Sequence, residues 1–337
     1  MDKSIKILIP MGGYGTRLRP LTWSRPKPLV CLAGQTVLDY VLATLDTVPQ
    51  VDSAEFIFSI NAQIEDQIVH HVSRFYPDWQ VQFPIDDAMR GQSDAFWQAK
   101  EHLEGPLLVV FSDTIIENDF SFLADETADA VIWVKPVPDP RRFGVTVVDE
   151  NGWITELIEK PDDMSNNLAV VGCYYFKDAA TILSAIEEQI ERELYLKGEF
   201  FIAQAINILL KRGLKMRVEK VETWLDAGTP EALLETNRFL LEAGDFSSDK
   251  LTSSENTVII PPVAIHPTAQ VRDSVIGPNV SLDENVTVEG CLLRDTIVGS
   301  GTTLSQSRLE HSLIGHNATI TGQIGRFNLG DNCQTEP

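Results

Sequence analysis

The chain is poor in positive charge: 27 Lys and Arg residues stand against 49 Asp and Glu, for a formal net charge of −22. A field of this sign repels nucleic acids and anionic membranes, so we expect neither as a partner. Small anionic substrates stay possible, because salt screens a distant negative surface and a local group of cations then dominates its neighbourhood.

Cysteines are few, and long apolar runs are missing. The four cysteines are scattered without a CxxC pair: Cys31, Cys173, Cys291 and Cys333. This spacing argues against a zinc ribbon or a disulfide framework and fits a reducing compartment. No apolar run approaches the roughly 18 residues of a membrane span, and the N-terminus enters a strand pattern without a signal-peptide core. We therefore expect a cytoplasmic protein.

The 337 residues suffice for one large domain and a smaller one. Up to about residue 243, β-branched runs alternate with amphipathic helical patterns. The expected strands are Ile5–Ile9, Glu55–Ile60, Leu107–Phe111 and Ala130–Val134, and the expected helices are Val37–Leu45, Gln63–Phe75 and Ser93–Leu103. This alternation predicts an α/β domain over residues 1–243, with a Rossmann-like mixed, mostly parallel sheet and helices on both faces.

A polar segment, residues 244–257, is predicted to be a linker, and a different texture follows it. Four imperfect copies of one theme begin at Ile276, Val298, Ile314 and Ile324, each with a glycine directly after the aliphatic residue. This hexapeptide pattern predicts a left-handed parallel β-helix over residues 258–337. A small β-sandwich is the alternative, although it calls for stricter two-residue alternation and longer strands.

Residues 11–29 are the most informative stretch. Three glycines, Gly12, Gly13 and Gly15, follow the first apolar strand and let the backbone bend close to a ligand. Four cations then come without a single acid: Arg17, Arg19, Arg25 and Lys27. Exposed backbone N–H groups with fixed cations form a place where phosphates are held. Gly12 and Asp113 both follow strands, at the sheet edge where ligands bind.

Together with later stretches, this run resembles the signature of the sugar-1-phosphate nucleotidyltransferases, also called NDP-sugar pyrophosphorylases, and within them glucose-1-phosphate thymidylyltransferase-type enzymes with a C-terminal β-helix. The family elements matched, in chain order, are a metal-binding strand end, a sugar-binding hairpin, a sugar-contact strand and a closing W-x-D-x-G-T element. Their residues here are Phe111–Thr114, Arg142–Val145 with Glu159–Pro161, Asn167–Gly172 and Trp224–Thr229.

The resemblance implies that an NTP and a sugar-1-phosphate give an NDP-sugar and pyrophosphate, and it favours dTTP or UTP with glucose-1-phosphate. Both reactants are anions, so positioning and charge stabilisation dominate catalysis. Arg17 would clamp the departing phosphates, and Lys27 would act as a point charge at the α-phosphate. Asp113 and Asp226 would hold Mg²⁺. The remaining candidates are nucleotide-binding Gly12, Gly13, Gly15, Thr16, Asp86 and Gly91, and sugar-phosphate-binding Gly144, Glu159, Lys160 and Val170.

Several of these residues have plainer interpretations. Asp113 could cap a helix or form a turn, and Asp226 could only shape the turn before Gly228. Glu159 could merely pair with Lys160, although exposed pairs of this kind stabilise little.

The chain departs from the family pattern at three places. Asp86 stands where pyrimidine-specific relatives carry glutamine, and a carboxylate, which only accepts hydrogen bonds, suits guanine N–H donors. The segment Arg90–Ala95 differs from the Gly-Thr-Ala-Gly of many mannose-1-phosphate enzymes, and this difference argues against guanylyl transfer. Gln204 replaces a usual acid near the sugar.

Three alternatives follow: a mannose-1-phosphate guanylyltransferase, a non-catalytic homologue that binds nucleotide sugars, and acyl transfer by a coil histidine. The last would use His266, His311 or His316. We expect the β-helix instead to cap the enzyme and to build a homo-oligomer, alone or together with the catalytic domain.

Overall fold

The computed structural model describes residues 4–244 and 256–336. Most of the predicted linker, 245–255, lies outside the described residues. Contacts between Cα atoms divide the chain into two compact units. The sheet unit comprises the residues up to Gly13 and Val41–Trp224, and the coil unit comprises Tyr14–Tyr40 and Leu225–Pro337. The segment with most of the glycine-rich run thus belongs with the C-terminal coils, while the domain boundaries 1–243 and 258–337 stay a prediction.

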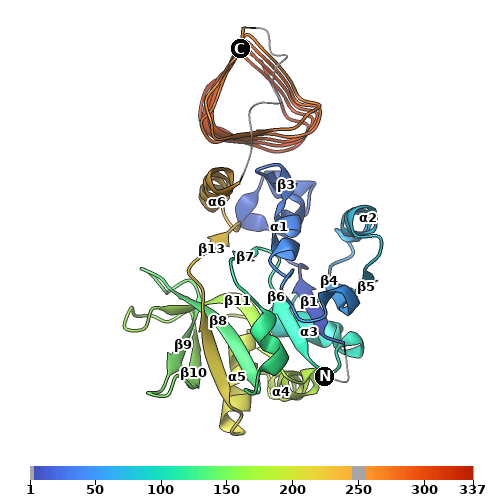
Figure 1. The fold of residues 1–337 in the computed structure, drawn as a ribbon, viewed down its shortest axis with the longest axis vertical. Coiled ribbons are helices and arrows are strands. Elements are labelled where there is room, and N and C mark those ends of the chain that lie inside the picture. The colour runs from blue at the N-terminus through green and yellow to red at the C-terminus, as the bar shows by residue number, and fades with distance from the viewer. Residues whose placement is uncertain (1–3, 245–255, 337) are drawn as a thin grey trace. The chain divides into compact units, whose positions relative to one another are not determined.

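The sheet unit is built on a nine-stranded mixed sheet with the order β10-β9-β11-β6-β1-β4-β5, and β8 joins β11 to β12 (Figure 1). Strand β1 pairs in parallel with β4 and β6, whereas β11 pairs antiparallel with β6 and β8. Its strands are β1 (Lys6–Pro10), β4 (Glu55–Ser59), β5 (Gln80–Gln82), β6 (Leu107–Val110), β8 (Ala130–Pro136), β9 (Gly144–Val148), β10 (Ile154–Glu159), β11 (Leu168–Phe176) and β12 (Met216–Lys220). The predicted mixed, mostly parallel α/β architecture is confirmed.

Helices cover this sheet because successive strand residues point to opposite faces and both sets are apolar. One set packs with the helices α3 (Gln92–Gln98), α4 (Ala179–Glu191) and α5 (Ile202–Lys211) in a single core cluster. The alternate residues of the same strands, such as Ile7 and Phe58, are also fully buried. Helix α2 (Glu65–Phe75) follows β4, and α1 (Val37–Ala43) spans the border between the two units.

The coil unit contains a parallel β-helix whose coils form a triangle in cross-section (Figure 1). Every strand pair in it is parallel, for example Val288 with Leu304 and Leu304 with Ile320. The β-sandwich alternative is therefore wrong. The coil strands are β14 (Val258–Ile259), β15 (Val263–Ile265), β16 (Gln270–Arg272), β17 (Val275–Ile276), β18 (Val280–Leu282), β19 (Thr287–Glu289), β20 (Leu292–Val298), β21 (Thr303–Ser305), β22 (Arg308–Ile314), β23 (Thr319–Thr321), β24 (Ile324–Gly325), β25 (Asn328–Leu329) and β26 (Gln334–Thr335).

The aliphatic residues of the repeats form the interior of the coils, as the hexapeptide pattern predicts. Val280, Leu293, Leu304 and Ile320 are all fully buried in one cluster. The same unit contains α6 (Pro230–Ala243) and the short hairpin of β2 (Cys31–Leu32) and β3 (Gln35–Thr36). In the described ranges, no helix is long and apolar enough to cross a membrane.

Two neighbouring leucines provide a matched test of the coil core. Leu293 is 0% exposed and Leu292 is 38% exposed. We expect Leu293→Ala to lower the free energy of unfolding by about 2–5 kcal/mol, because it leaves a cavity in a close-packed stack. Leu292→Ala removes the same atoms from a partly exposed position and should cost less than about 1 kcal/mol. Urea unfolding followed by circular dichroism measures both, and equal losses would contradict the assigned orientation of β20.

Candidate active site

The turn after β1 begins in the sheet unit with two glycines. The amide of Asn61, two residues after the end of β4, donates to the Gly12 carbonyl, and its Oδ1 accepts from the Gln63 backbone N–H at 2.9 Å. A Cβ on Gly12 would lie 3.8 Å from Asp86 Oδ2, whereas a Cβ on Gly13 would meet no atom within 4 Å. Asn61 thus holds the turn at Gly12, which lies against the Asp86 loop. At Gly13 the turn leaves space for a ligand.

Asp86, predicted to read the base, is only 3% exposed. Its Oδ1 accepts from the Met89 backbone N–H at 2.9 Å. Burial raises the pKa of this carboxyl; the Met89 N–H opposes the rise and the nearby Asp94 carboxylate adds to it. A buried carboxyl next to an open glycine turn is an arrangement that can select a base by its hydrogen-bonding groups.

Gly91 adopts a backbone conformation that only glycine takes without strain. Its φ is +119°, and a Cβ there would lie 2.7 Å from the Phe200 backbone nitrogen. Phe200 N–H donates to the Arg90 carbonyl at 2.7 Å, and Ser93 N–H donates to the Phe200 carbonyl at 2.9 Å. The fully buried Asp94 accepts from Arg90 Nη2 at 2.8 Å. The predicted base loop is therefore bonded to the segment around Phe200.

The predicted sugar-phosphate residues gather at the hairpin of β9 and β10. Gly144 pairs with Glu159, and a Cβ on Gly144 would lie 3.0 Å from Glu159 Oε2. Lys160 is held by its backbone N–H, which donates to the Phe143 carbonyl at 2.9 Å. Its ammonium lies 4.3 Å from the centre of the Phe201 ring, so a cation–π contact and not a pair with Glu159 orients it.

Burial raises the pKa of Glu159 to about 7; the Lys160 ammonium opposes this shift and the Glu199 carboxylate adds to it. The predicted strand residue Val170 is 8% exposed on β11, beside Ala169, which pairs with Val145 of the hairpin. Glu159 is thus adjacent in sequence to a cation, and the hairpin that carries it pairs with β11.

Asp113 lies in the turn between β6 and β7 (Thr114–Ile116). The Thr114 backbone N–H donates to the Phe111 carbonyl at 2.9 Å, and Thr114 Oγ1 donates to the Val171 carbonyl at 2.7 Å. A strand, not a helix, follows Asp113, so the helix-cap interpretation is wrong. Its place beyond β6 is the sheet edge that the sequence predicted, and its metal role stays a prediction.

The rest of the glycine-rich run lies in the coil unit. Gly15 has φ +57°, and a Cβ there would lie 3.1 Å from the Cβ of Lys27. The Gly15 carbonyl accepts from Thr22 Oγ1 at 2.7 Å and from the Leu18 backbone N–H at 2.9 Å. Thr16–Leu18 and Lys27–Leu29 form short 3₁₀ turns. Thr22 lies in a further 3₁₀ turn, Leu21–Trp23, and its hydroxyl ties that turn to the one that carries Thr16 and Arg17.

Asp226, at the end of β13 (Trp224–Asp226), shapes the turn that follows it. Its Oδ1 accepts from the Gly228 backbone N–H at 2.8 Å, and its carbonyl accepts from Thr236 Oγ1 at 2.8 Å. A Cβ on Gly228 would lie 3.1 Å from Arg17 Nη2 and 2.8 Å from Asp226 Oδ1. The turn-shaping interpretation therefore holds, and the same turn brings Arg17 close to Asp226.

Each unit gathers its own part of the predicted site. The sheet unit contains Gly12, Gly13, Asp86, Gly91, Asp113, Gly144, Glu159, Lys160 and Val170, and the coil unit contains Gly15, Thr16, Arg17, Lys27 and Asp226. The two predicted metal carboxylates belong to different units, so their pairing stays a prediction. Within the part of the chain that the structure describes, no three His, Cys, Asp or Glu side chains gather for a metal.

Sequence reasoning missed Asn61, Phe200 and Phe201. Asn61 carried a usable signal, because it stands directly after a strand at the ligand-binding edge of a parallel sheet. The two phenylalanines carried none, because an apolar residue beside a helix is indistinguishable from an ordinary core residue.

The three coil histidines are engaged by neighbouring coil residues. His266 Nδ1 lies 2.8 Å from Thr268 Oγ1, His316 Nδ1 accepts from the Ser300 backbone N–H at 3.0 Å, and His311 pairs with Asp295. Burial is the main cause that lowers the pKa of His316, with the Arg25 guanidinium contributing. These contacts are structural ones and give no support to acyl transfer.

Comparisons with known proteins fit this geometry. A family model described as "Nucleotidyl transferase" matches residues 6–243. The low-salt glycan biosynthesis nucleotidyltransferase Agl11 of Haloferax volcanii is 29% identical over 94% of this chain and 94% of its own. A glucose-1-phosphate thymidylyltransferase of Streptomyces griseus is 28% identical over 98% and 99%. A UDP-glucose pyrophosphorylase solved with UDP-glucose shares the fold, with a TM-score of 0.61, 18% identity and coverage of 72% and 100%.

The raised pKa of Glu159 predicts a pH dependence of stability. Its folded value of about 7 lies above the ordinary glutamate value, so the folded state holds a proton that the unfolded state has released. The contribution of Glu159 to the free energy of unfolding is fully present below about pH 4. It is lost as the pH rises towards 7, and the total loss is about 3 kcal/mol. We expect the melting temperature of Glu159→Gln to fall much less between pH 5 and 8 than that of the wild type, because glutamine does not ionise.

The exposed Glu156 lies on the same strand and provides the control. Glu156→Gln should leave the pH slope of the wild-type protein unchanged. Parallel slopes for wild type and Glu159→Gln would contradict the assigned pKa.

Proposed function

The chain belongs to the nucleotidyl transferase family, as a sugar-1-phosphate nucleotidyltransferase, and from this membership we propose that it joins dTTP or UTP to glucose-1-phosphate. The observation that supports the proposal is the contact of the Gly12 turn with the buried Asp86 loop, because a phosphate-binding turn beside a group that selects the base would need this proximity. The similarity to a thymidylyltransferase along nearly the whole chain supports the choice of nucleotide and sugar.

In the proposed reaction, a phosphate oxygen of the sugar-1-phosphate attacks the α-phosphorus of the NTP. A new P–O bond forms, the bond from the α-phosphorus to the bridging oxygen breaks, and pyrophosphate leaves with both bonding electrons. The attacking phosphate is already ionised, so no general base is needed. The backbone N–H groups of Gly13, Gly15 and Thr16 hold the triphosphate, Arg17 neutralises the departing phosphates, and Lys27 stabilises the charge at the α-phosphate.

Nucleotidyltransferases of this family generally use a divalent metal. Asp113 and Asp226 offer only carboxylate oxygens, the donors that Mg²⁺ prefers, so the residues fit this ion. We propose that these two residues hold Mg²⁺ together with phosphate oxygens. When bound, the ion supplies charge neutralisation at the phosphates.

Glu159 and Lys160 are the proposed sugar-phosphate groups. The Lys160 ammonium would contact the phosphate, and the Glu159 carboxylate would accept hydrogen bonds from sugar hydroxyls. Their fixed geometry at the β9–β10 hairpin supports this assignment. The residues that a non-catalytic homologue would lose, Arg17, Lys27 and both acids, are all present.

One observation favours a second candidate, mannose-1-phosphate guanylyl transfer. In its ionised form the buried Asp86 carboxylate only accepts hydrogen bonds, and guanine presents N–H donors where thymine and uracil present a mixed edge.

A nucleotide-by-sugar activity matrix distinguishes the two. We expect pyrophosphate release with dTTP or UTP and glucose-1-phosphate at least tenfold faster than with GTP and mannose-1-phosphate, and its loss when EDTA removes the divalent metal. The reverse preference would establish the guanylyl candidate. No release with any pair would refute enzymatic transfer.

The same assay tests the assigned cation. Lys27→Ala should lower kcat by about 10²–10³-fold, because it removes a charge that stabilises the transition state. The exposed Lys177, in the sheet unit, is the matched control, and Lys177→Ala should leave turnover unchanged. Unchanged turnover in Lys27→Ala would show that the proposed mechanism is wrong.

We also propose a homo-oligomer and a cytoplasmic location. One face of the β-helix exposes a column of residues in register that is apolar except for Arg308, with Val258, Leu292 and Ile324 at 56%, 38% and 77% exposure. A second copy would cover such a column with its own. The four cysteines are free thiols, which supports a reducing compartment.

Sedimentation velocity of the full chain tests the oligomer. We expect Ile324→Glu to shift the wild-type oligomer toward smaller species, because it replaces the most exposed apolar side chain of this column with a charge. Thr303→Glu adds the same charge on another face of the β-helix and should leave the assembly intact. A monomeric wild type, or equal assembly of both variants, would contradict the proposal.

A further inference from the structure

The segment that carries Arg17 and Lys27 is held by the β-helix. Residues 14–40 form one compact unit with residues 225–337. This arrangement matters because the proposed roles of both cations depend on their exact placement.

One anchor is on a late coil of the β-helix. Ser24, three residues before Lys27, donates from Oγ to Asp331 Oδ2 at 2.7 Å. The other carboxylate oxygen, Oδ1, accepts from the His316 backbone N–H at 2.8 Å. The next residue back, Gly330, lies so close that a Cβ on it would be 2.9 Å from the Pro20 carbonyl oxygen. Asp331 thus links the glycine-rich segment to two successive coils.

A second anchor lies at the other end of the segment. The Ala33 backbone N–H donates to Asn237 Oδ1 at 2.9 Å and to Ser281 Oγ at 3.1 Å, and Ser281 Oγ donates to Asn237 Oδ1 at 2.7 Å. Asn237 on α6 is 0% exposed and Ser281 on β18 is 5% exposed. Buried hydrogen bonds of this kind are strong restraints, because breaking one leaves a polar group unpaired.

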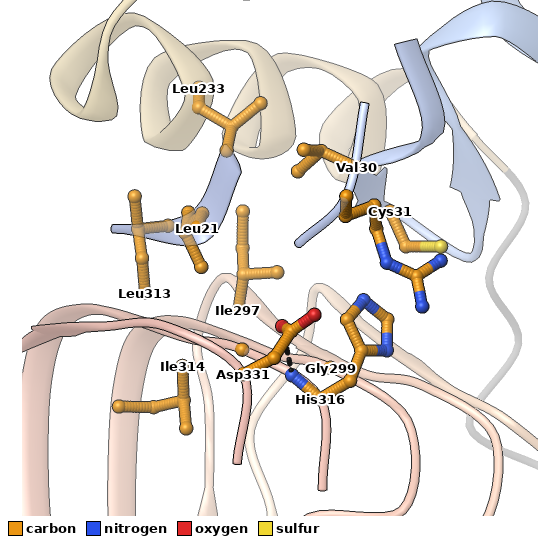
Figure 2. A pocket seen from close by; sticks show the side chains of 12 residues that line it. Leu21, Val30, Cys31, Leu233, Ile297, Gly299, Leu313, Ile314, His316 and Asp331 are labelled. Atoms are coloured by element: carbon orange, nitrogen blue, oxygen red, sulfur yellow. Dashed lines mark hydrogen bonds between the residues drawn. The ribbon is translucent and has the colours of Figure 1, made fainter. Parts of the chain in front are cut away.

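Between the two anchors the packing is interrupted by a pocket (Figure 2). Its apolar walls come from the segment, from α6 and from the two coil strands β20 and β22, and the side chains are Leu21, Val30, Leu233, Ile297, Leu313 and Ile314. Asp331, His316, Cys31 and Arg25 line its polar part, and Asp331 is bonded to the His316 backbone there. Because apolar contact is incomplete here, the hydrogen-bonded anchors must carry much of the restraint on residues 20–30.

We propose that Asp331 is a positioning residue for catalysis: through Ser24 it fixes the turns that present Arg17 and Lys27, so that the β-helix is part of the catalytic apparatus. The proposal rests on the proposed roles of these two cations. Thr22, two residues before Ser24, completes the link, since its hydroxyl donates to the Gly15 carbonyl. A displacement of the Ser24 end is transmitted directly to the turn that carries Arg17.

The test uses the full chain and the variants Ser24→Ala, Asp331→Ala and Asp331→Asn. Asparagine keeps an acceptor for the His316 N–H and a partner for Ser24, so it should restore what alanine loses. Ser305→Ala is the control, because it removes a single hydrogen bond to Thr321 between two coils. Hydrogen exchange of peptides from residues 14–30, kcat, both KM values and the melting temperature are measured for each.

We expect Ser24→Ala and Asp331→Ala to speed exchange in residues 14–30 and to lower kcat about tenfold, with both KM values within about twofold. The double variant should lose no more than either single one, because the two residues act as a unit. Ser305→Ala should match wild type in exchange at residues 14–30 and in kcat.

Unchanged exchange in Asp331→Ala would overturn the anchor. Faster exchange with unchanged kcat would overturn the positioning role, as would a loss of melting temperature alone. If the wild-type protein transfers no nucleotide at all, the proposed function fails, and the catalytic part of this inference falls with it, while the exchange measurement still decides whether the anchor exists.

Discussion

Two phosphate-bearing anions have to meet on a chain that itself carries a net charge of −22. Repulsion between the reactants is the main barrier, and it can be lowered only by cations and N–H groups that are already in place. The structure meets this constraint locally. Arg17 is brought close to Asp226 at the Gly228 turn, and Lys27 packs on Gly15. Lys160 is oriented by the Phe201 ring.

Buried polar groups carry the restraints in the sheet unit. Asp94, fully buried, binds Arg90, and the backbone of Phe200 bonds the same loop on both sides of Gly91. The neighbouring Phe201 contacts Lys160. The predicted base loop and the predicted sugar-phosphate pair are thus joined through two adjacent residues.

The β-helix also restrains the segment that carries Arg17 and Lys27. A stack of apolar coils is rigid, because each coil is paired along its length with the next. A short segment of 3₁₀ turns has few hydrogen bonds of its own, so it depends on whatever it packs against. Contacts through Asp331 and Asn237 transfer the rigidity of the coils to the segment that carries the proposed catalytic cations.

The periodic patterns and ordered motifs of the sequence were enough to predict the α/β sheet, the β-helix, the family and the residue types that handle phosphates. Those features depend on local rules: alternation sets strands and helices, and glycine with cations marks a phosphate turn. The partners of those residues could not be predicted from local patterns. That Phe200 bonds the backbone of Arg90, that burial raises the pKa of Glu159 to about 7, and that Ser24 reaches Asp331 across 307 positions were decided by tertiary structure alone. Burial and hydrogen bonding between distant segments set these properties, and neither is encoded in the spacing of neighbouring residues.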